Sequence, residues 1–284
     1  MSPHPNPSPE GEGLYASAQI DMRGVMSSPF AFTHALCRAP APSAVRGLRA
    51  EDGPDPDFAG LAAEHAAYVA TLRDLGLSVD VLPPLDDFPD ALFTEDVALT
   101  FPEGAVLLRP GAPSRAGEVE PMRAPLAARH ARLLEMTGPG HADGGDVLRL
   151  ADRMIIGLSA RTDRAGAEEL AALLDTLGLR AEIAETPPGV LHFKTGCGLI
   201  DEASILAVPA LAACPQFAGL TVVETPSGEE AAANLLRIGD TILVGARWSA
   251  TRALLSARGI AIRPMATDQI ARIDAGLSCM SLRW

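Results

Sequence analysis

Four cysteine side chains are the first candidates for chemistry in this sequence. They are Cys37, Cys197, Cys214 and Cys279, and no two of them form a C-x-x-C pair. No group of histidines and cysteines has the spacing of a zinc site, and four cysteines in a chain of 284 residues do not indicate a disulfide framework. Each cysteine is therefore interpreted either as a small buried apolar side chain or as a nucleophile, which attacks as the thiolate.

Carboxylates are the second feature with chemical potential. The segment FPDALFTED contains Asp90, Glu95 and Asp96, and carboxylate oxygens bind planar guanidinium or ammonium groups well. Taken alone, this segment is more typical of a solvated acidic loop than of a binding site. Asp143 begins a DGGD motif, in which two glycines permit a tight turn and the aspartate is a common turn residue. Asp146 at the end of the motif is expected to be structural.

The charge balance restricts the partners of the protein. The formal net charge is −13, which argues against a nucleic-acid partner because phosphate neutralisation needs a basic face. The same charge is compatible with a cationic small-molecule substrate. No apolar run has the roughly 20 residues of a membrane span, so no membrane association is expected. The N-terminus shows no basic region followed by an apolar one, which predicts a cytoplasmic location.

Two regions with different composition follow one another along the chain. Residues 1–29 include PHPNPSPEGEG, which is rich in proline and glycine and has no apolar periodicity. This composition predicts a disordered extension. Residues 30–284 are predicted to form a single catalytic domain.

The elements that must position the candidate side chains recur along this domain. Pairs of apolar runs joined by a short turn predict hairpins over 97–111, 146–158, 197–210 and 234–246. Apolar residues at helical spacing predict helices over 58–75 and 164–177. A fifth unit is expected to pair the strand THALCRA with the C-terminal strand LSCMSLRW. Recurrence on this scale indicates a radially repeated architecture.

Several segments, in their order and spacing, resemble one known family. They are THALCRA (33–39), FPDALFTEDVAL (88–99), RPGAPSRAGEVE (109–120), DGGDVL (143–148), GLSARTD (157–163), LHFKTGCG (191–198) and IDAGLSCMSLRW (273–284). Together they resemble the dimethylarginine dimethylaminohydrolases, which belong to the guanidino-group modifying superfamily, or penteins. The resemblance implies an α/β fold, a five-bladed pseudo-symmetric propeller of ββαβ units.

The resemblance also implies roles for particular residues. Cys279 matches the nucleophile, His192 the acid/base histidine, and Asp143 the acidic residue that pairs with that histidine or with the substrate. Substrate-binding positions are matched by Leu48, Asp90, Phe93, Glu95, Asp96, Arg115, Arg161, Ile273 and Asp274. Among these, Arg115 and Arg161 match residues that bind the α-carboxylate of the substrate. No metal and no cofactor is implied.

The activity implied by the resemblance is hydrolysis of Nω-methylated L-arginine to L-citrulline and an alkylamine, through a covalent thiouronium on Cys279. One alternative is an arginine deiminase-like hydrolase of free arginine or another guanidino compound. A second alternative is a non-catalytic pentein-fold binding protein, against which Cys279, His192 and Asp143 argue together. The protein is expected to be a monomer or a homodimer.

Overall fold

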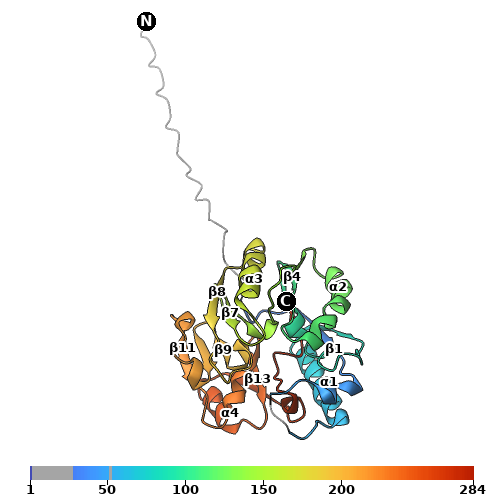
Figure 1. Cartoon of the computed structure of the whole chain (residues 1–284). Helices are drawn as coiled ribbons and strands as arrows, with labels where there is room; N and C mark the ends of the chain where they lie inside the picture. Colours follow the sequence, from blue (N-terminus) through green and yellow to red (C-terminus); the bar gives the residue numbers. More distant parts are fainter. Residues whose placement is uncertain (2–27, 51–52) are drawn as a thin grey trace.

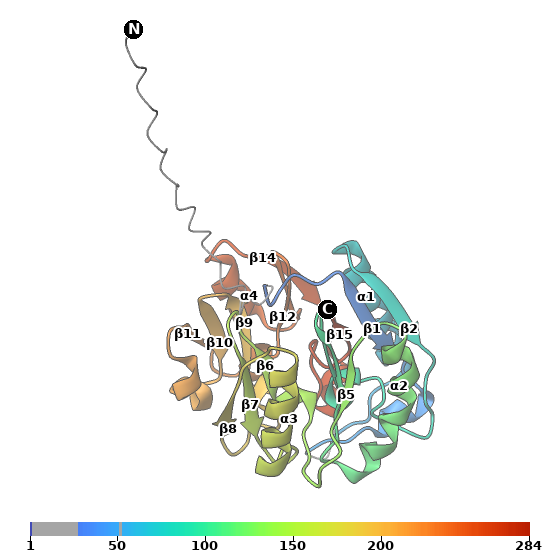
Figure 2. The ribbon, with the colours of Figure 1, turned by 90° about the horizontal axis from the view of Figure 1, so that it is seen from above.

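The computed structural model describes residues 1, 28–50 and 53–284, so the predicted disordered extension lies almost wholly outside the described residues. In the described part of the chain, fifteen strands form five separate sheets of three strands each. Figures 1 and 2 show these sheets set around a common centre, with helices α1 (Phe58–Asp74), α2 (Glu120–Ala127) and α3 (Arg164–Thr176) on the outside. The predicted five-bladed α/β propeller is therefore confirmed.

Each blade repeats one topology. Its middle strand is antiparallel to one neighbour and parallel to the other, and a helix or 3-10 turns lead into the parallel strand. The second and third blades consist of β3 (Ala98–Phe101), β4 (Gly104–Leu107) and β5 (Leu133–Glu135), and of β6 (Val147–Arg149), β7 (Met154–Leu158) and β8 (Ala181–Glu185). The fourth and fifth consist of β9 (Cys197–Asp201), β10 (Ser204–Ala207) and β11 (Thr221–Glu224), and of β12 (Leu236–Ile238), β13 (Thr241–Gly245) and β14 (Ala261–Met265). The four predicted hairpins coincide with the antiparallel pairs of these blades.

The first blade joins the two ends of the domain. Strand β1 (His34–Arg38) is antiparallel to β15 (Leu282–Arg283) and parallel to β2 (Ser78–Leu82). The predicted closure of the ring is therefore confirmed. However, β15 is shorter than the predicted strand LSCMSLRW, because the chain forms a turn over residues 277–280. The candidate nucleophile Cys279 thus lies in a turn before the strand.

Apolar packing between helices and sheets holds each blade together. In the third blade, α3 buries Leu170 and Leu174 completely, and both belong to the apolar cluster that contains Ile156 of β7. Full burial of one such side chain contributes about 1.5–3 kcal/mol. Asp163 begins α3 by accepting a hydrogen bond from the Gly166 N–H at 2.7 Å. The predicted helix over 164–177 therefore agrees with the structure.

Helix α4 (Ser249–Ser256) covers the fifth blade, whereas the fourth blade has only two 3-10 turns, over Pro209–Leu211 and Pro215–Phe217, in place of a helix. Proline cannot continue a helix from the preceding turn, so Pro215 prevents one helix from running from the first of these turns through the second. No helix in the described ranges has both the length and the apolar character needed to cross a membrane.

Candidate active site

The turn that carries Cys279 is fixed by contacts from two other blades. The backbone N–H of Ser278 donates to Asn234 Oδ1 at 3.2 Å, and the Asn234 amide lies 3.7 Å from Cys279 Sγ. The Glu95 N–H donates to the Cys279 carbonyl at 3.2 Å. Gly276 lies so close to the Asn234 side chain that a Cβ there would clash with it at 2.3 Å. These contacts fix the sulfur at the centre of the ring.

The surroundings of Cys279 favour the neutral thiol in the resting protein. Burial, followed by the carboxylates of Asp96 and Glu95, raises the pKa of the thiol to about 11, although Lys194 and the hydrogen bond with Gly276 lower it in part. A cationic group bound beside the sulfur would shift this preference toward the thiolate, because an opposite charge within a few ångströms favours the ionised form. The thiol is therefore poised to ionise when a cation enters the pocket.

His192 precedes a 3-10 turn that fixes its backbone. Its N–H donates to Thr195 Oγ1 at 3.1 Å, and its carbonyl accepts from the Thr195 N–H at 3.0 Å. The ring Nε2 lies 3.3 Å from Asp143 Oδ2, and Asp143 Oδ1 accepts from the Gly111 N–H at 2.7 Å. Asp143 is completely buried, so its orientation is held by the backbone on one side and by the imidazole on the other.

Carboxylates around His192 stabilise its protonated form. Burial lowers the pKa of the imidazole, but the hydrogen bond with Asp143 and the charges of Asp96, Asp146 and Asp143 outweigh burial and raise the pKa to about 9. His192 is therefore an imidazolium at neutral pH, which is the form that protonates a leaving amine.

The two glycines of the DGGD motif allow close packing at this centre. A Cβ on Gly145 would lie 2.7 Å from His192 Nδ1 and 2.8 Å from Asp96 Oδ1, and one on Gly144 would lie 2.0 Å from the Glu95 carbonyl. Neither glycine has a positive φ. The DGGD motif forms the expected tight turn, a 3-10 turn over Gly144–Asp146, and the two glycines also provide the space that this packing requires.

Three ionisable side chains at this centre offer atoms close enough for a shared cation. Atoms of Asp96, Asp143 and His192 all lie within 4.8 Å of one another. At neutral pH, however, the imidazolium has no lone pair to donate. The observed contact between His192 and Asp143 is an ion pair of an acid–base centre, and it fits proton transfer.

Asp96 and Arg115 form the second buried ion pair of the site. Arg115 Nη1 pairs with Asp96 Oδ2, and its Nε and Nη2 pair with Glu118, with an Nη2–Oε2 distance of 2.8 Å. Arg115 Nη2 also donates to the carbonyls of Asp90 and Phe93 at 3.1 and 2.9 Å. Although burial favours the protonated carboxyl, Arg115 and His192 lower the pKa of Asp96. Asp96 is therefore held as a carboxylate within the site.

A pocket of about 90 Å³ brings most of the predicted site residues together. Its lining includes ten of the twelve predicted residues, which are Leu48, Asp90, Phe93, Asp96, Arg115, Arg161, His192, Ile273, Asp274 and Cys279. Arg49, Ala50 and Leu191 also line it, and none of these three was predicted. Leu191 could have been predicted, because it lies next to His192 in the segment LHFKTGCG. Asn234, which contacts the Cys279 turn, begins a predicted hairpin but belongs to none of the segments that carry the family resemblance.

Unlike Arg115, the other arginine predicted to bind substrate is not engaged in a buried ion pair within the described part of the chain. Among the described residues, the Arg161 guanidinium has no hydrogen-bond or ion-pair partner, so it is available to an anionic group in the pocket. Leu48 is 39% exposed, and its N–H donates to Asp90 Oδ1 at 2.9 Å. Asp274 adopts a left-handed conformation with φ of 53°, and its carboxylate accepts from the Ala50 N–H. The loop with Leu48 and Ala50 is thus tied to both acidic residues.

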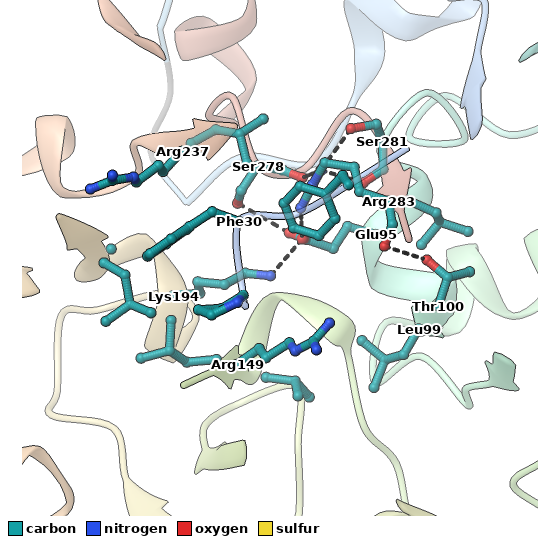
Figure 3. A pocket seen from close by; sticks show the side chains of 18 of the residues that line it. Phe30, Glu95, Leu99, Thr100, Arg149, Lys194, Arg237, Ser278, Ser281 and Arg283 are labelled. Carbon is teal, nitrogen blue, oxygen red and sulfur yellow. Dashed lines mark hydrogen bonds and ion pairs between the residues drawn. The ribbon is translucent and has the colours of Figure 1, made fainter. Parts of the chain in front are cut away.

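Two predicted residues lie outside the pocket lining. Asp143 lies behind His192, in contact with its ring. Glu95 instead lines a separate pocket, where its carboxylate pairs with Lys194 at 2.5 Å and Arg283 at 2.9 Å and accepts from Ser278 Oγ at 3.1 Å (Figure 3). The structure therefore places Glu95 beside its sequence neighbour Asp96 but directs the two carboxylates into different pockets.

Comparisons with known proteins agree with this geometry. The arginine deiminase family model matches residues 84–213. The N(G),N(G)-dimethylarginine dimethylaminohydrolase of Pseudomonas aeruginosa is 33% identical over 89% of this chain and 100% of its own length, and that of Streptomyces coelicolor is 30% identical over 88% and 96%.

Solved structures show the same relationship. A mutant of the P. aeruginosa enzyme in complex with citrulline superposes with a TM-score of 0.87 at 32% identity, over 90% of this chain and all of that one. The N-terminal domain of a cyanobacterial arginine dihydrolase shares the fold, with a TM-score of 0.76 at 18% identity over 88% of this chain and 96% of that one. From its sequence relatives, and with a cysteine, a histidine and an aspartate gathered at the centre of five blades, the chain belongs to the dimethylarginine dimethylaminohydrolase family.

Proposed function

We propose that this protein hydrolyses Nω-methylated L-arginine to L-citrulline and an alkylamine. The observation that carries the proposal is one pocket that joins Cys279 and His192 to Asp96 and to the guanidinium of Arg161, which has no partner among the described residues. A carboxylate and a guanidinium in the same pocket suit a substrate that carries both a guanidinium and an α-carboxylate. The relatives from P. aeruginosa and S. coelicolor carry the name of this activity.

The substrate-binding roles follow from the charges that line the pocket. Asp96 binds the guanidinium, and Arg161 binds the α-carboxylate. Asp90 and the Ile273 carbonyl accept hydrogen bonds from the α-ammonium group, beneath the loop that carries Leu48. Arg115 acts through Asp96, because its own donors are largely engaged by Asp96, Glu118 and two carbonyls.

The first half of the reaction forms a covalent intermediate. Binding of the cationic guanidinium favours ionisation of Cys279, whose proton passes to solvent, and the thiolate adds to the guanidinium carbon. The C–N bond to the methylated nitrogen breaks as the His192 imidazolium protonates that nitrogen, so the amine leaves neutral. The product of this half is a cationic thiouronium on the sulfur.

The second half releases citrulline. His192, now neutral, takes a proton from water, and the hydroxide adds to the thiouronium carbon. The C–S bond then breaks and returns the thiolate, while the protonated urea loses its proton to solvent. Asp143 holds the imidazole ring in place for both proton transfers through its contact at 3.3 Å.

The apolar part of the pocket supports a preference for methylated substrates. Phe93, Leu191 and Ile273 line the pocket together with the charged groups. A methyl group in an apolar site contributes about 1–3 kcal/mol, or 10–200-fold in kcat/KM. Hydrolysis of free arginine is the alternative, favoured by the match to the arginine deiminase family model.

A substrate panel tests the proposal. Arginine, monomethylarginine and asymmetric dimethylarginine are incubated with the protein, and citrulline is measured. We expect kcat/KM to be at least about tenfold higher for a methylated form than for arginine. A higher value for arginine would support the deiminase alternative, and no citrulline from any of the three would support a non-catalytic pentein-fold protein. The proposal also includes a cytoplasmic location, a monomer or homodimer, and no nucleic-acid partner.

A further inference from the structure

Asp146, at the end of the DGGD motif, is a second completely buried aspartate close to the site. It does not line the pocket of Cys279. Its Oδ2 accepts hydrogen bonds from Ser159 Oγ and Thr162 Oγ1, both at 2.7 Å, and its Oδ1 accepts from the Phe193 N–H at 2.8 Å. One carboxylate thus receives three donors from two loops that are distant in sequence.

These donors belong to the segments that carry the site residues. Phe193 directly follows His192. Ser159 Oγ also accepts from the backbone N–H of Arg161 at 3.0 Å, and Thr162 Oγ1 accepts from the Asp143 N–H at 3.1 Å. Asp146 is therefore connected to the backbone of Arg161 through Ser159, to that of Asp143 through Thr162, and to that of His192 through Phe193.

The carboxyl group of Asp146 is buried without an ion-pair partner among the described residues, and burial raises its pKa, although the charge of His192 and the hydrogen bonds lower it in part. Its hydrogen bonds are all to neutral groups, whereas Asp96 pairs with Arg115 and Asp143 with His192. Burying a carboxylate in this way costs free energy that apolar packing at the same position would not require. Its field acts on His192, which also faces Asp96 and Asp143 and shares its pocket with Arg161 and Cys279.

We propose that Asp146 is a positioning residue that fixes the His192 loop and the Arg161 turn in one relative geometry. It thereby sets the distance between the group that protonates the leaving amine and the group that anchors the substrate carboxylate. A misplacement of about 1 Å can cost about 100-fold in rate, so this connection affects turnover as well as folding. The kinetic part of this inference rests on the proposed function, whereas the effect on His192 does not.

The test compares Asp146→Asn with the same substitution at Asp201, which also accepts hydrogen bonds from a hydroxyl and a backbone N–H but is only partly buried. Asp201 accepts from Ser204 Oγ at 2.6 Å and from the Ala203 N–H at 2.8 Å, at the end of a strand that does not line the pocket. In Asp146→Asn we expect the pKa of His192 to fall by about one unit, because a nearby negative charge is removed. This pKa is measured by NMR in the absence of substrate. We also expect kcat to fall and KM to rise, each by about tenfold or more. Asp201→Asn should leave all three values near those of the wild type.

A second pair of variants keeps the carboxylate of Asp146 and changes one of its hydrogen-bond donors, Thr162. Thr162→Val removes the hydroxyl that links Asp146 to Asp143, and we expect KM to rise about tenfold as the Arg161 turn shifts. Thr162→Ser retains the hydroxyl and should restore KM. This pair remains informative if Asp146→Asn does not fold.

Two results would overturn the inference. One is an Asp146→Asn protein with a lower melting temperature but an unchanged His192 pKa and unchanged kinetics, since this would assign Asp146 to stability alone. The other is equal KM for Thr162→Val and Thr162→Ser. If the wild type itself turns over no guanidino substrate, the proposed function fails, and the NMR measurement still decides whether Asp146 acts on His192.

Discussion

The protonation of His192 should make the free energy of unfolding depend on pH. In the folded protein the pKa of this imidazole is raised to about 9 from an ordinary value of 6.5, because the hydrogen bond with Asp143 and the charges of Asp96 and Asp146 outweigh burial. A change of one pKa unit corresponds to 1.36 kcal/mol, so this gap corresponds to about 3 kcal/mol. The side chain is 8% exposed, so little of this is lost to solvent screening.

The sign of the effect follows from proton binding in the two states. Between about pH 6.5 and about pH 9 the folded state holds a proton that the unfolded state has released, so the free energy of unfolding falls as pH rises. The contribution is fully present below about pH 6.5 and is lost as the pH passes the folded pKa of about 9.

The assay is urea unfolding at several pH values of two proteins that both carry Cys279→Ser, so that ionisation of the thiol does not contribute. One retains His192 and the other carries His192→Gln. We expect the difference between their free energies of unfolding to favour His192 by about 3 kcal/mol more at about pH 6 than at about pH 9.5. A difference that does not change with pH would refute the assignment of a protonated His192 beside Asp143.

Three further substitutions test separate parts of the site. Cys279→Ser should abolish citrulline formation while calorimetry still detects substrate binding, because a serine hydroxyl is not ionised without a dedicated base, and turnover above about a tenth of the wild-type rate would contradict the role of Cys279 as nucleophile. Arg161→Ala should raise KM about tenfold or more with a smaller change in kcat, and an unchanged KM in steady-state kinetics would remove Arg161 from the binding site. Arg115→Ala should lower the free energy of unfolding by about 3–5 kcal/mol in urea titrations, since it leaves Asp96 and Glu118 buried without their cation, and a loss below about 1 kcal/mol would contradict the buried ion pairs.

Much of the fold could be predicted from the sequence because it depends on local patterns. Turn residues between short apolar runs predicted the hairpins, and the periodicity over 58–75 and 164–177 predicted α1 and α3. The helices α2 and α4 were not predicted, since each has only eight residues and offers too few turns for a clear period. The turn at Cys279 was not predicted either, because contacts from Asn234 and Glu95 on other blades determine it.

The sequence predicted which residues belong to the site better than it predicted how their side chains are arranged. Sequence order does not reveal that Glu95 and Asp96 direct their carboxylates into different pockets, because the blades of the ring decide which partner each one meets. Arg115 was predicted to bind the substrate carboxylate, and it lines the pocket; the sequence does not reveal that Asp96 and Glu118 engage its guanidinium. The partners of Asp146 lie 13 to 47 residues away, and no motif spacing marks them.

The pairing of β1 with β15 has a consequence for how activity arises during folding. His192, Asp143 and Arg161 belong to segments next to the third and fourth blades, which can form their hairpins from local contacts. Cys279 reaches the same pocket only when the last strand of the domain pairs with the first, a contact that spans almost the whole described fold. Loop closure over such a distance is slow compared with hairpin formation. After dilution from denaturant, the rate at which turnover recovers would therefore measure the last long-range step of folding. The rate at which the circular dichroism signal recovers would measure formation of the individual blades.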